Sequence, residues 1–245
     1  MPLKESEAIV LRSYPLGEGD RLVSFLSRTS GRLRGVARGA RRPKSHFGST
    51  LELLSHIRIW YYELETRDLV RITQSEMMES FLAAQQDYTV ATGLALVSEV
   101  TEAVLPEHEA ADPVFRLVLL TARNIHSGAG MWLPLAYFAL WTVRLAGWLP
   151  SLETCQQCGR EFGSSGAVEL LTGELVCAIC RGGGRPISGQ ALTMGRRVLA
   201  EKLDALRQSD PGEQEVKKLL ELALDIVERQ TERKLTTRKL LEEGM

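Results

Sequence analysis

The sequence lacks any apolar run long enough to cross a membrane, although 44% of its 245 residues are hydrophobic. The strongest apolar stretch, Met131–Val143, contains Pro134 and is shorter than the roughly 20 residues that a spanning helix needs. Lys4 and Glu5 stand where the apolar core of a secretory signal peptide would lie. We therefore expect a cytoplasmic protein without a membrane partner, whose few cysteines are not joined in disulfides.

Motifs that carry catalysis are also missing. Gly17-Glu18-Gly19 starts like a dinucleotide-binding loop but lacks the third glycine of that fingerprint. No glycine-rich loop ends in the Lys-Ser or Lys-Thr pair that cradles phosphates. The four histidines are scattered without metal-ligand spacing, so surface or core positions explain them better than catalysis. These absences predict a protein that is not an enzyme.

Acidic residues are absent from one long segment. The whole chain has a formal net charge of −1, with 30 Lys and Arg against 31 Asp and Glu, which excludes a uniformly basic nucleic-acid-binding protein. From Arg28 to Phe47, however, seven residues are basic and none is acidic. The near-neutral total therefore conceals one local basic segment.

Short β-like runs separated by turn residues fill the first 80 residues. Closing five short strands into a barrel removes exposed sheet edges, so this pattern favours a small barrel. Beyond residue 80 the apolar residues repeat with a helical period, as they do from Val216 to Val227. The fold prediction is α+β, with a barrel domain at 1–80 and a helical domain at 81–245. The expected strands are Ala8–Arg12, Leu22–Leu26, Arg32–Arg38, Ser55–Tyr62 and Leu69–Thr73, and further expected helices cover about 84–104, 113–126, 132–147 and 190–207.

All four cysteines fall within one window of the helical part. Cys155 and Cys158 form one C-x2-C pair, and Cys177 and Cys180 form a second pair after an 18-residue gap. Each pair supplies two thiolates from a tight turn, and four thiolates complete the tetrahedron that zinc prefers. The spacing therefore predicts one structural Zn²⁺ ion, with no coordination position left for water or substrate.

The residues between the two pairs fit a zinc-ribbon-like module, which we place at about 151–186. Its hairpin is predicted to consist of strands Val168–Leu171 and Glu174–Cys177, joined by Thr172-Gly173. Two other interpretations of the cysteines stay open, namely two independent redox C-x-x-C pairs or four buried thiols. The confinement of both pairs to one window favours zinc.

The basic segment combines a predicted strand with a loop. Alternate residues of a strand project from opposite faces, so its arginines share the outer face while Leu33, Gly35 and Ala37 face the interior. Guanidinium groups match the geometry of phosphates, so this surface is predicted to follow a nucleic-acid backbone. The alternative is a solvated edge strand whose charges prevent strand pairing. The predicted nucleic-acid contacts are Arg32, Arg34, Arg38, Arg41, Arg42 and Lys44.

A second group of residues shares one parity of the strand expected at Ser55–Tyr62. Arg58, Trp60 and Tyr62 would form a stacking and cationic platform for nucleic acid if they faced solvent. An aromatic stripe is more often part of a core or a domain interface, and we assign Trp60 and Tyr62 there.

Several of these stretches together resemble one family. Gly19–Ser27 followed by Thr29–Arg42 is similar to the turn, strand, T/S-x-G hairpin, strand and K/R-G-x-R run that opens the RecO family of bacterial recombination mediators. Glu7–Leu11 resembles the first strand of that family. Leu145–Pro150, which leads into the cysteines, and Leu235–Leu241 also resemble family stretches. The resemblance extends over essentially the whole chain.

This resemblance implies an N-terminal OB-fold and a helical C-terminal domain that carries the zinc module. It implies DNA repair through recombination, binding to single- and double-stranded DNA without sequence preference, strand annealing, and no covalent chemistry. The implied partners are RecR, the acidic C-terminal tail of single-strand-binding protein and, indirectly, RecA, which is loaded onto coated single strands. The implied location is the nucleoid-associated cytoplasm. Some family members lack the cysteines, which favours a structural role for zinc.

Two functions of other classes stay open at this point. The first is a zinc-stabilised scaffold that binds only proteins and whose basic loop has no direct DNA role. The second is a small enzyme that uses its cysteines as a redox relay, which tightly bound zinc and inert thiols would exclude.

Overall fold

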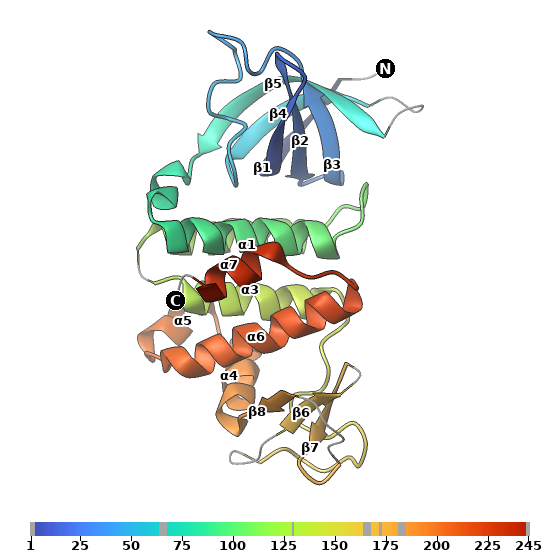
Figure 1. Cartoon of the computed structure of the whole chain (residues 1–245), viewed down its shortest axis with the longest axis vertical. Helices are drawn as coiled ribbons and strands as arrows, with labels where there is room; N and C mark the ends of the chain where they lie inside the picture. The colour runs from blue at the N-terminus through green and yellow to red at the C-terminus, as the bar shows by residue number, and fades with distance from the viewer. Residues whose placement is uncertain are drawn as a thin grey trace. The chain divides into compact units, whose positions relative to one another are not determined.

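The computed structural model describes residues 3–63, 68–128, 130–163, 168–171, 173–180 and 185–243 (Figure 1). The chain divides into two compact units, which we describe separately. The first unit consists of Met1–Ala129 and Leu235–Met245, and the second consists of Gly130–Lys234. No helix within the described ranges is long and apolar enough to span a membrane.

Five strands of the first unit form a closed barrel. Its strand order is β1-β2-β3-β5-β4, and β4 pairs back with β1. All neighbouring strands are antiparallel except β3 and β5, which are parallel. This closed five-stranded arrangement is that of an OB-fold, so the predicted barrel and the predicted α+β class are confirmed. The strands are β1 (Leu3–Leu16), β2 (Asp20–Ser27), β3 (Gly31–Ala37), β4 (His56–Tyr62) and β5 (Leu69–Glu79).

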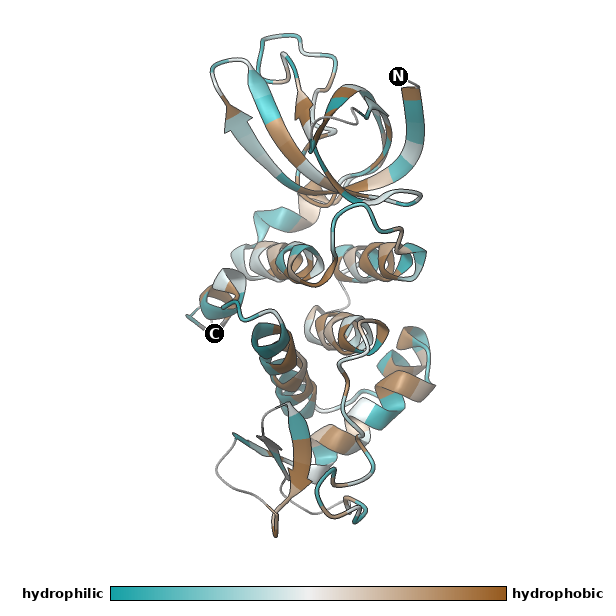
Figure 2. Ribbon diagram, turned by 90° about the vertical axis from the view of Figure 1, so that its right-hand side faces the viewer, coloured by the Kyte–Doolittle hydropathy of each residue, from teal (hydrophilic) through white to brown (hydrophobic). Residues whose placement is uncertain are grey.

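Alternating side chains build the barrel core, and Figure 2 shows hydrophobic and hydrophilic residues alternating along the strands. On β3, Leu33 and Ala37 are fully buried while Arg34 is exposed, as predicted. A Cβ atom at Gly35 would lie 2.7 Å from Cγ2 of Val70, so only glycine fits where β5 pairs with β3. The inward parity of β3 therefore leaves its arginines on the outside.

Tyr61 fills the barrel from β4. Its ring is fully buried and meets Phe25 edge to face, with 5.8 Å between ring centroids. Trp60 and Tyr62 have the opposite parity and are half-buried on the outer face, where Trp60 Nε1 donates a hydrogen bond to Glu5 (3.1 Å). Trp60 and Tyr62 therefore do not enter the barrel core, because the β4 register turns Tyr61 inward instead, and their assignment to a domain interface stays a prediction.

Helices complete the first unit. They are η1 (Leu82–Gln86), α1 (Tyr88–Val104), α2 (Asp112–His126) and α7 (Thr236–Glu243). Glu99 of α1 is only 3% exposed, and its carboxylate accepts hydrogen bonds from the backbone N–H groups of Thr236 (3.1 Å) and Thr237 (2.9 Å). These bonds satisfy donors that the start of α7 leaves without intrahelical partners. Within the described residues, the compact unit thus combines the barrel with α1, α2 and α7, while the domain boundary near residue 80 stays a prediction.

The second unit combines helices with a small sheet. The sheet has the order β7-β6-β8, and both strand pairs are antiparallel. The predicted hairpin of β6 and β7 is confirmed with the same bounds, and Gly173 in its turn has φ +91°. Thr172 lies outside the described residues, and the third strand, β8, was not predicted. The elements are α3 (Trp132–Leu145), β6 (Val168–Leu171), β7 (Glu174–Cys177), β8 (Arg185–Ile187), α4 (Gly189–Ala200), α5 (Leu203–Gln208) and α6 (Glu213–Gln230).

The helix predicted at about 190–207 is two helices, α4 and α5. The backbone is extended at Glu201 and Lys202, and the second helix buries Leu203 and Leu206. The indole Nε1 of Trp141 donates to the carbonyl of Val198 (3.1 Å), one of the last carbonyls of α4 that lack an intrahelical partner. The single-helix prediction is wrong because the apolar period alone does not locate this change of direction.

Candidate nucleic-acid interface and metal centre

The loop that follows β3, residues 38–46, is fixed to the barrel at both ends. The backbone N–H of Gly39 donates to Asp20 Oδ1 (2.8 Å), and that of Arg41 donates to the carbonyl of Gly19 (3.0 Å). Phe47, just after the loop, is buried in the barrel core. The exposed cations of this loop therefore extend from a fixed backbone. They are Arg38, Arg41, Arg42 and Lys44.

The cations of the loop border the turn between β1 and β2. Arg41 Nη1 donates to the carbonyl of Gly17 (2.9 Å), and a Cβ atom at Gly19 would lie 3.4 Å from Nε of Arg42. Within the described part of the chain, Arg38, Arg42 and Lys44 have no acidic partner. Their charge is thus available to an anion from solution, such as a phosphate group. We call the 17–19 turn and the 38–46 loop together the basic rim.

Arg32 and Arg34 differ from the other four predicted contacts because both pair with Glu107. Arg32 Nη1 lies 3.0 Å and Arg34 Nε 2.8 Å from Glu107 Oε1. Arg32 also donates from Nε to the carbonyl of Leu105 (2.9 Å), and its side chain is only 17% exposed. The structure therefore brings four predicted residues together on the rim and places Arg32 and Arg34 beside Glu107, whose position no local sequence pattern indicates.

A close backbone approach brings Glu107 to β3. The carbonyl of Arg32 accepts a hydrogen bond from the N–H of His108 (3.0 Å). Gly31 has φ +72°, and a Cβ atom there would lie only 1.9 Å from the carbonyl oxygen of Glu109. Because the pairing of β3 with β5 begins only at Arg34, the segment 105–109 takes the free edge at the start of β3.

The four cysteines of the second unit converge on one point. Their Sγ atoms all lie within 4.8 Å of one another, with 3.8 Å between those of Cys158 and Cys177. Gln156, inside the first pair, exchanges two hydrogen bonds with Leu175 of β7 and so attaches that turn to the sheet. Four thiols gathered in this way can hold a metal ion, and the fold of the hairpin is what brings the two pairs together.

The environment of the sulfurs favours thiolates at two of the four positions. Burial raises the pKa of Cys155, but N–H donors from Cys177, Cys158 and Gln157 outweigh burial and lower that pKa to about 6. The N–H of Cys180 lowers the pKa of Cys177. A hydrogen bond with Cys158, followed by burial, raises the pKa of Cys180 to about 12. The sulfurs therefore compete for protons, as expected of a cluster that a cation would stabilise.

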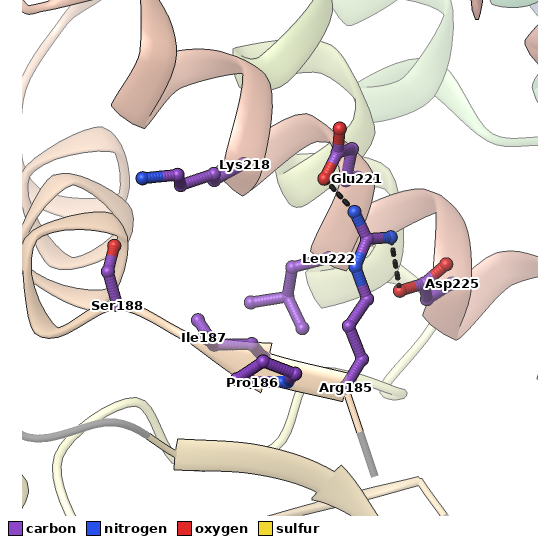
Figure 3. Close-up of a pocket in the computed structure, with 8 residues that line it drawn as sticks. All are labelled: Arg185, Pro186, Ile187, Ser188, Lys218, Glu221, Leu222 and Asp225. Atoms are coloured by element: carbon purple, nitrogen blue, oxygen red, sulfur yellow. Dashed lines mark hydrogen bonds and ion pairs between the residues drawn. The ribbon is translucent and has the colours of Figure 1, made fainter.

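A pocket of about 360 Å³ lies between β8, the adjoining Ser188 and α6 of the second unit (Figure 3). Pro186, Ile187 and Leu222 give it an apolar lining. Arg185 forms ion pairs with Glu221 and with Asp225 (3.3 Å to the latter). These paired charges attach the small sheet to α6, so we assign this pocket a role in packing.

The OB-fold belongs to a class of barrels that bind oligonucleotides or oligosaccharides, and in this chain it carries a basic rim and is combined with helices and a four-cysteine module. Two family models match consecutive parts of the chain, namely Recombination protein O N terminal over residues 1–81 and Recombination protein O C terminal over residues 85–239. The chain therefore belongs to the RecO family, and it has a role in DNA repair and recombination. The resemblance inferred from the sequence is confirmed.

Curated relatives support this assignment along the full length. The chain is 37% identical over 245 residues to DNA repair protein RecO of Koribacter versatilis (strain Ellin345), and the match covers 98% of each chain. It is 34% identical to the protein of the same name from Streptomyces griseus, over 82% of this chain and 84% of the relative. It is 35% identical to that of Bifidobacterium animalis subsp. lactis, over 68% and 72%.

Proposed function

We propose that this chain is a recombination mediator that binds single- and double-stranded DNA without sequence specificity and anneals complementary strands. The observation that carries the proposal is the basic rim. It holds Arg38, Arg42 and Lys44 without acidic partners within the described ranges, on a backbone that the barrel fixes. Contacts from such side chains to phosphates position a strand and read no sequence. No covalent step is needed.

Annealing follows from charge neutralisation in this proposal. Two complementary strands repel each other through their phosphates, and a cationic surface lowers that repulsion so that bases pair. Each phosphate contact contributes about −0.7 to the slope of log affinity against log salt for a single strand. Four rim cations therefore correspond to a slope of about −3. Arg32 and Arg34 join the interface in this proposal only when they exchange Glu107 for phosphate.

Family membership supports the choice of partners. We propose that the chain acts with RecR, contacts the acidic C-terminal tail of single-strand-binding protein, and so helps RecA to load onto coated single strands. The proposed location is the cytoplasm, in association with the nucleoid. These partners are inferred from the family, and co-purification of each with the full chain would test them one at a time.

We also propose that the metal of the second unit is one structural Zn²⁺ ion. A tetrahedral zinc site with Zn–S distances of about 2.3 Å has sulfur–sulfur edges of about 3.8 Å. The Cys158 to Cys177 separation of 3.8 Å fits that edge. Cys155 and Cys180 complete the proposed ligand set, and bound zinc would hold the two cysteine turns on the sheet.

Strand annealing tests the proposed function. Two complementary labelled oligonucleotides are mixed with the parent protein or with an Arg38→Ala, Arg41→Ala, Arg42→Ala variant that is shown to be folded. A control variant carries Arg116→Ala, Lys218→Ala and Lys239→Ala, which remove the same net charge elsewhere.

We expect the rim variant to lose annealing and the control variant to keep it. Fast annealing by both variants would move the DNA site away from the rim. If the parent itself fails to anneal or to bind DNA, the mediator proposal is wrong and a protein-binding scaffold becomes the better explanation.

A further inference from the structure

An apolar row with an exposed aromatic ring crosses the outer face of the barrel. The strand register pairs Tyr14 on β1 with Leu22 on β2, and Leu22 with Val36 on β3. Their neighbours Val23 and Ala37 belong to the barrel core, so the row faces outward. Tyr14 is 47% exposed, and Leu22 and Val36 are half-buried. Side chains of three neighbouring strands therefore form a continuous apolar surface, which we call the floor of the row, and the Tyr14 ring is the most exposed part of the row.

The ring of Tyr14 is held in place by a chain of contacts. Arg12 Nη1 donates a hydrogen bond to the Tyr14 hydroxyl (2.9 Å). Arg12 in turn forms an ion pair with Glu102 and lies 4.0 Å from Glu99, both on α1. A ring fixed in this way loses little conformational freedom when a ligand stacks on it.

The row lies directly beside the basic rim. Val36 shares its face of β3 with Arg34 and, just beyond the strand, with Arg38. The β1 strand continues from Tyr14 to the 17–19 turn, whose first carbonyl binds Arg41. Acidic groups are present too, because Glu18 is exposed in that turn and Asp20 binds the N–H of Gly39. The cations outnumber them, so a strand with its phosphates on the rim would have its bases near the row.

We propose that Tyr14, with Leu22 and Val36 as its floor, is a stacking site for unpaired bases of single-stranded DNA. This inference rests on the proposed function and adds a second kind of contact to it. Every base has a π-face, so stacking on a tyrosine tolerates any sequence, as a mediator requires. Bases inside a duplex are already stacked on their neighbours, so the site distinguishes unpaired from paired DNA.

The test compares full-length variants on three probes by fluorescence anisotropy. The probes are an oligothymidine strand, an abasic strand of the same length, and a duplex of that length. The variants are Tyr14→Ala, Tyr14→Phe and, as a matched control, Tyr88→Ala, which removes a tyrosine that is 62% exposed at the start of α1. Thermal melting confirms that each variant is folded.

We expect Tyr14→Ala to bind oligothymidine about 5- to 150-fold more weakly, the range for losing one stacked base. Its affinity for the abasic strand and for the duplex should match the parent, and its salt slope should not change because no phosphate contact is lost. Tyr14→Phe keeps the ring and should stay within about twofold of the parent. Tyr88→Ala should bind all three probes normally.

Two results would overturn this inference while leaving the mediator proposal intact. One is unchanged oligothymidine binding by Tyr14→Ala. The other is an equal loss on the abasic strand, which would mean that Tyr14 supports the rim and does not stack on bases. A parent protein that binds none of the probes would instead refute the proposed function itself.

Discussion

Replacing Gly31, the first residue of β3, with alanine adds one methyl group, which we expect to push β3 and the segment 105–109 apart. The φ of Gly31, +72°, is in the left-handed region, and a Cβ atom there would lie 1.9 Å from the carbonyl oxygen and 2.4 Å from the carbonyl carbon of Glu109. Backbone atoms cannot rotate away as the end of a flexible side chain can. Gly31→Ala must therefore push the segment 105–109 away from β3.

The expected cost follows from the contacts that the segment makes. Left-handed backbone costs an alanine about 1–2 kcal/mol. The hydrogen bond from His108 N–H to the Arg32 carbonyl is worth about 1 kcal/mol, and the charged one from Arg32 to the Leu105 carbonyl about 1.5–3 kcal/mol. Together these give about 3.5–6 kcal/mol. In a protein of this size, each kcal/mol lowers the melting temperature by about 2–4 °C.

Gly17→Ala is the matched control for this prediction. Gly17 has φ +59°, but no atom lies within 4 Å of a Cβ placed there, so only the backbone cost of about 1–2 kcal/mol applies. Calorimetry measures the stability of both variants, and hydrogen exchange across residues 31–37 reports whether the β3 edge has opened. Equal stability of the two variants, with no faster exchange in Gly31→Ala, would refute the argument from close approach.

Three further predictions concern charge, metal and pH. Glu107→Gln should raise the affinity for single-stranded DNA, because Arg32 and Arg34 are then released to bind phosphates. The slope of log affinity against log salt should steepen by up to about 1.4. Glu109→Gln on the same segment should change neither quantity, and anisotropy titrations measure both. Cys158→Ser should lower the zinc content measured by elemental analysis and make the second unit sensitive to protease. The annealing rate should stay unchanged, and a loss of annealing would contradict a purely structural metal. Burial lowers the pKa of His56, so the His56 imidazole takes up a proton more readily in the unfolded chain than in the folded protein. The free energy of unfolding should therefore fall as the pH drops below about 6.5. His56→Gln should remove this part of the pH dependence of the free energy of unfolding, which urea titrations measure. One pKa unit corresponds to about 1.4 kcal/mol. An unchanged pH profile would assign the effect to other groups.

Features set by neighbouring residues were predictable from the sequence. The alternation from Gly31 to Ala37 indicated which side chains enter the barrel, because a strand has a period of two. The hairpin of β6 and β7 could be placed with its observed bounds, since Gly173 marks its turn and the cysteine pairs enclose it. The gathering of the four sulfurs also follows from spacing alone.

Features set by distant residues were not predictable. Arg32 and Arg34 look like free cations in sequence, and nothing local indicates that Glu107 lies against them. The strand β8 has only three residues, too few to show a period, and it forms because β6 offers an edge. The outward position of Trp60 depends on the barrel register, which one strand read by itself does not determine.

The discontinuity of the first unit has a consequence for how the protein is made. The barrel, α1 and α2 emerge from the ribosome early, but α7, which packs on α1, is translated only after the 105 residues from 130 to 234. Until then the carboxylate of Glu99 lacks the N–H donors of Thr236 and Thr237 and has Arg12, 4.0 Å away, as its charged partner. It must stay partly hydrated, because burying a charge with too few hydrogen-bond donors is costly. The part of the protein that is translated first thus reaches its final packing only after the whole second unit has been translated.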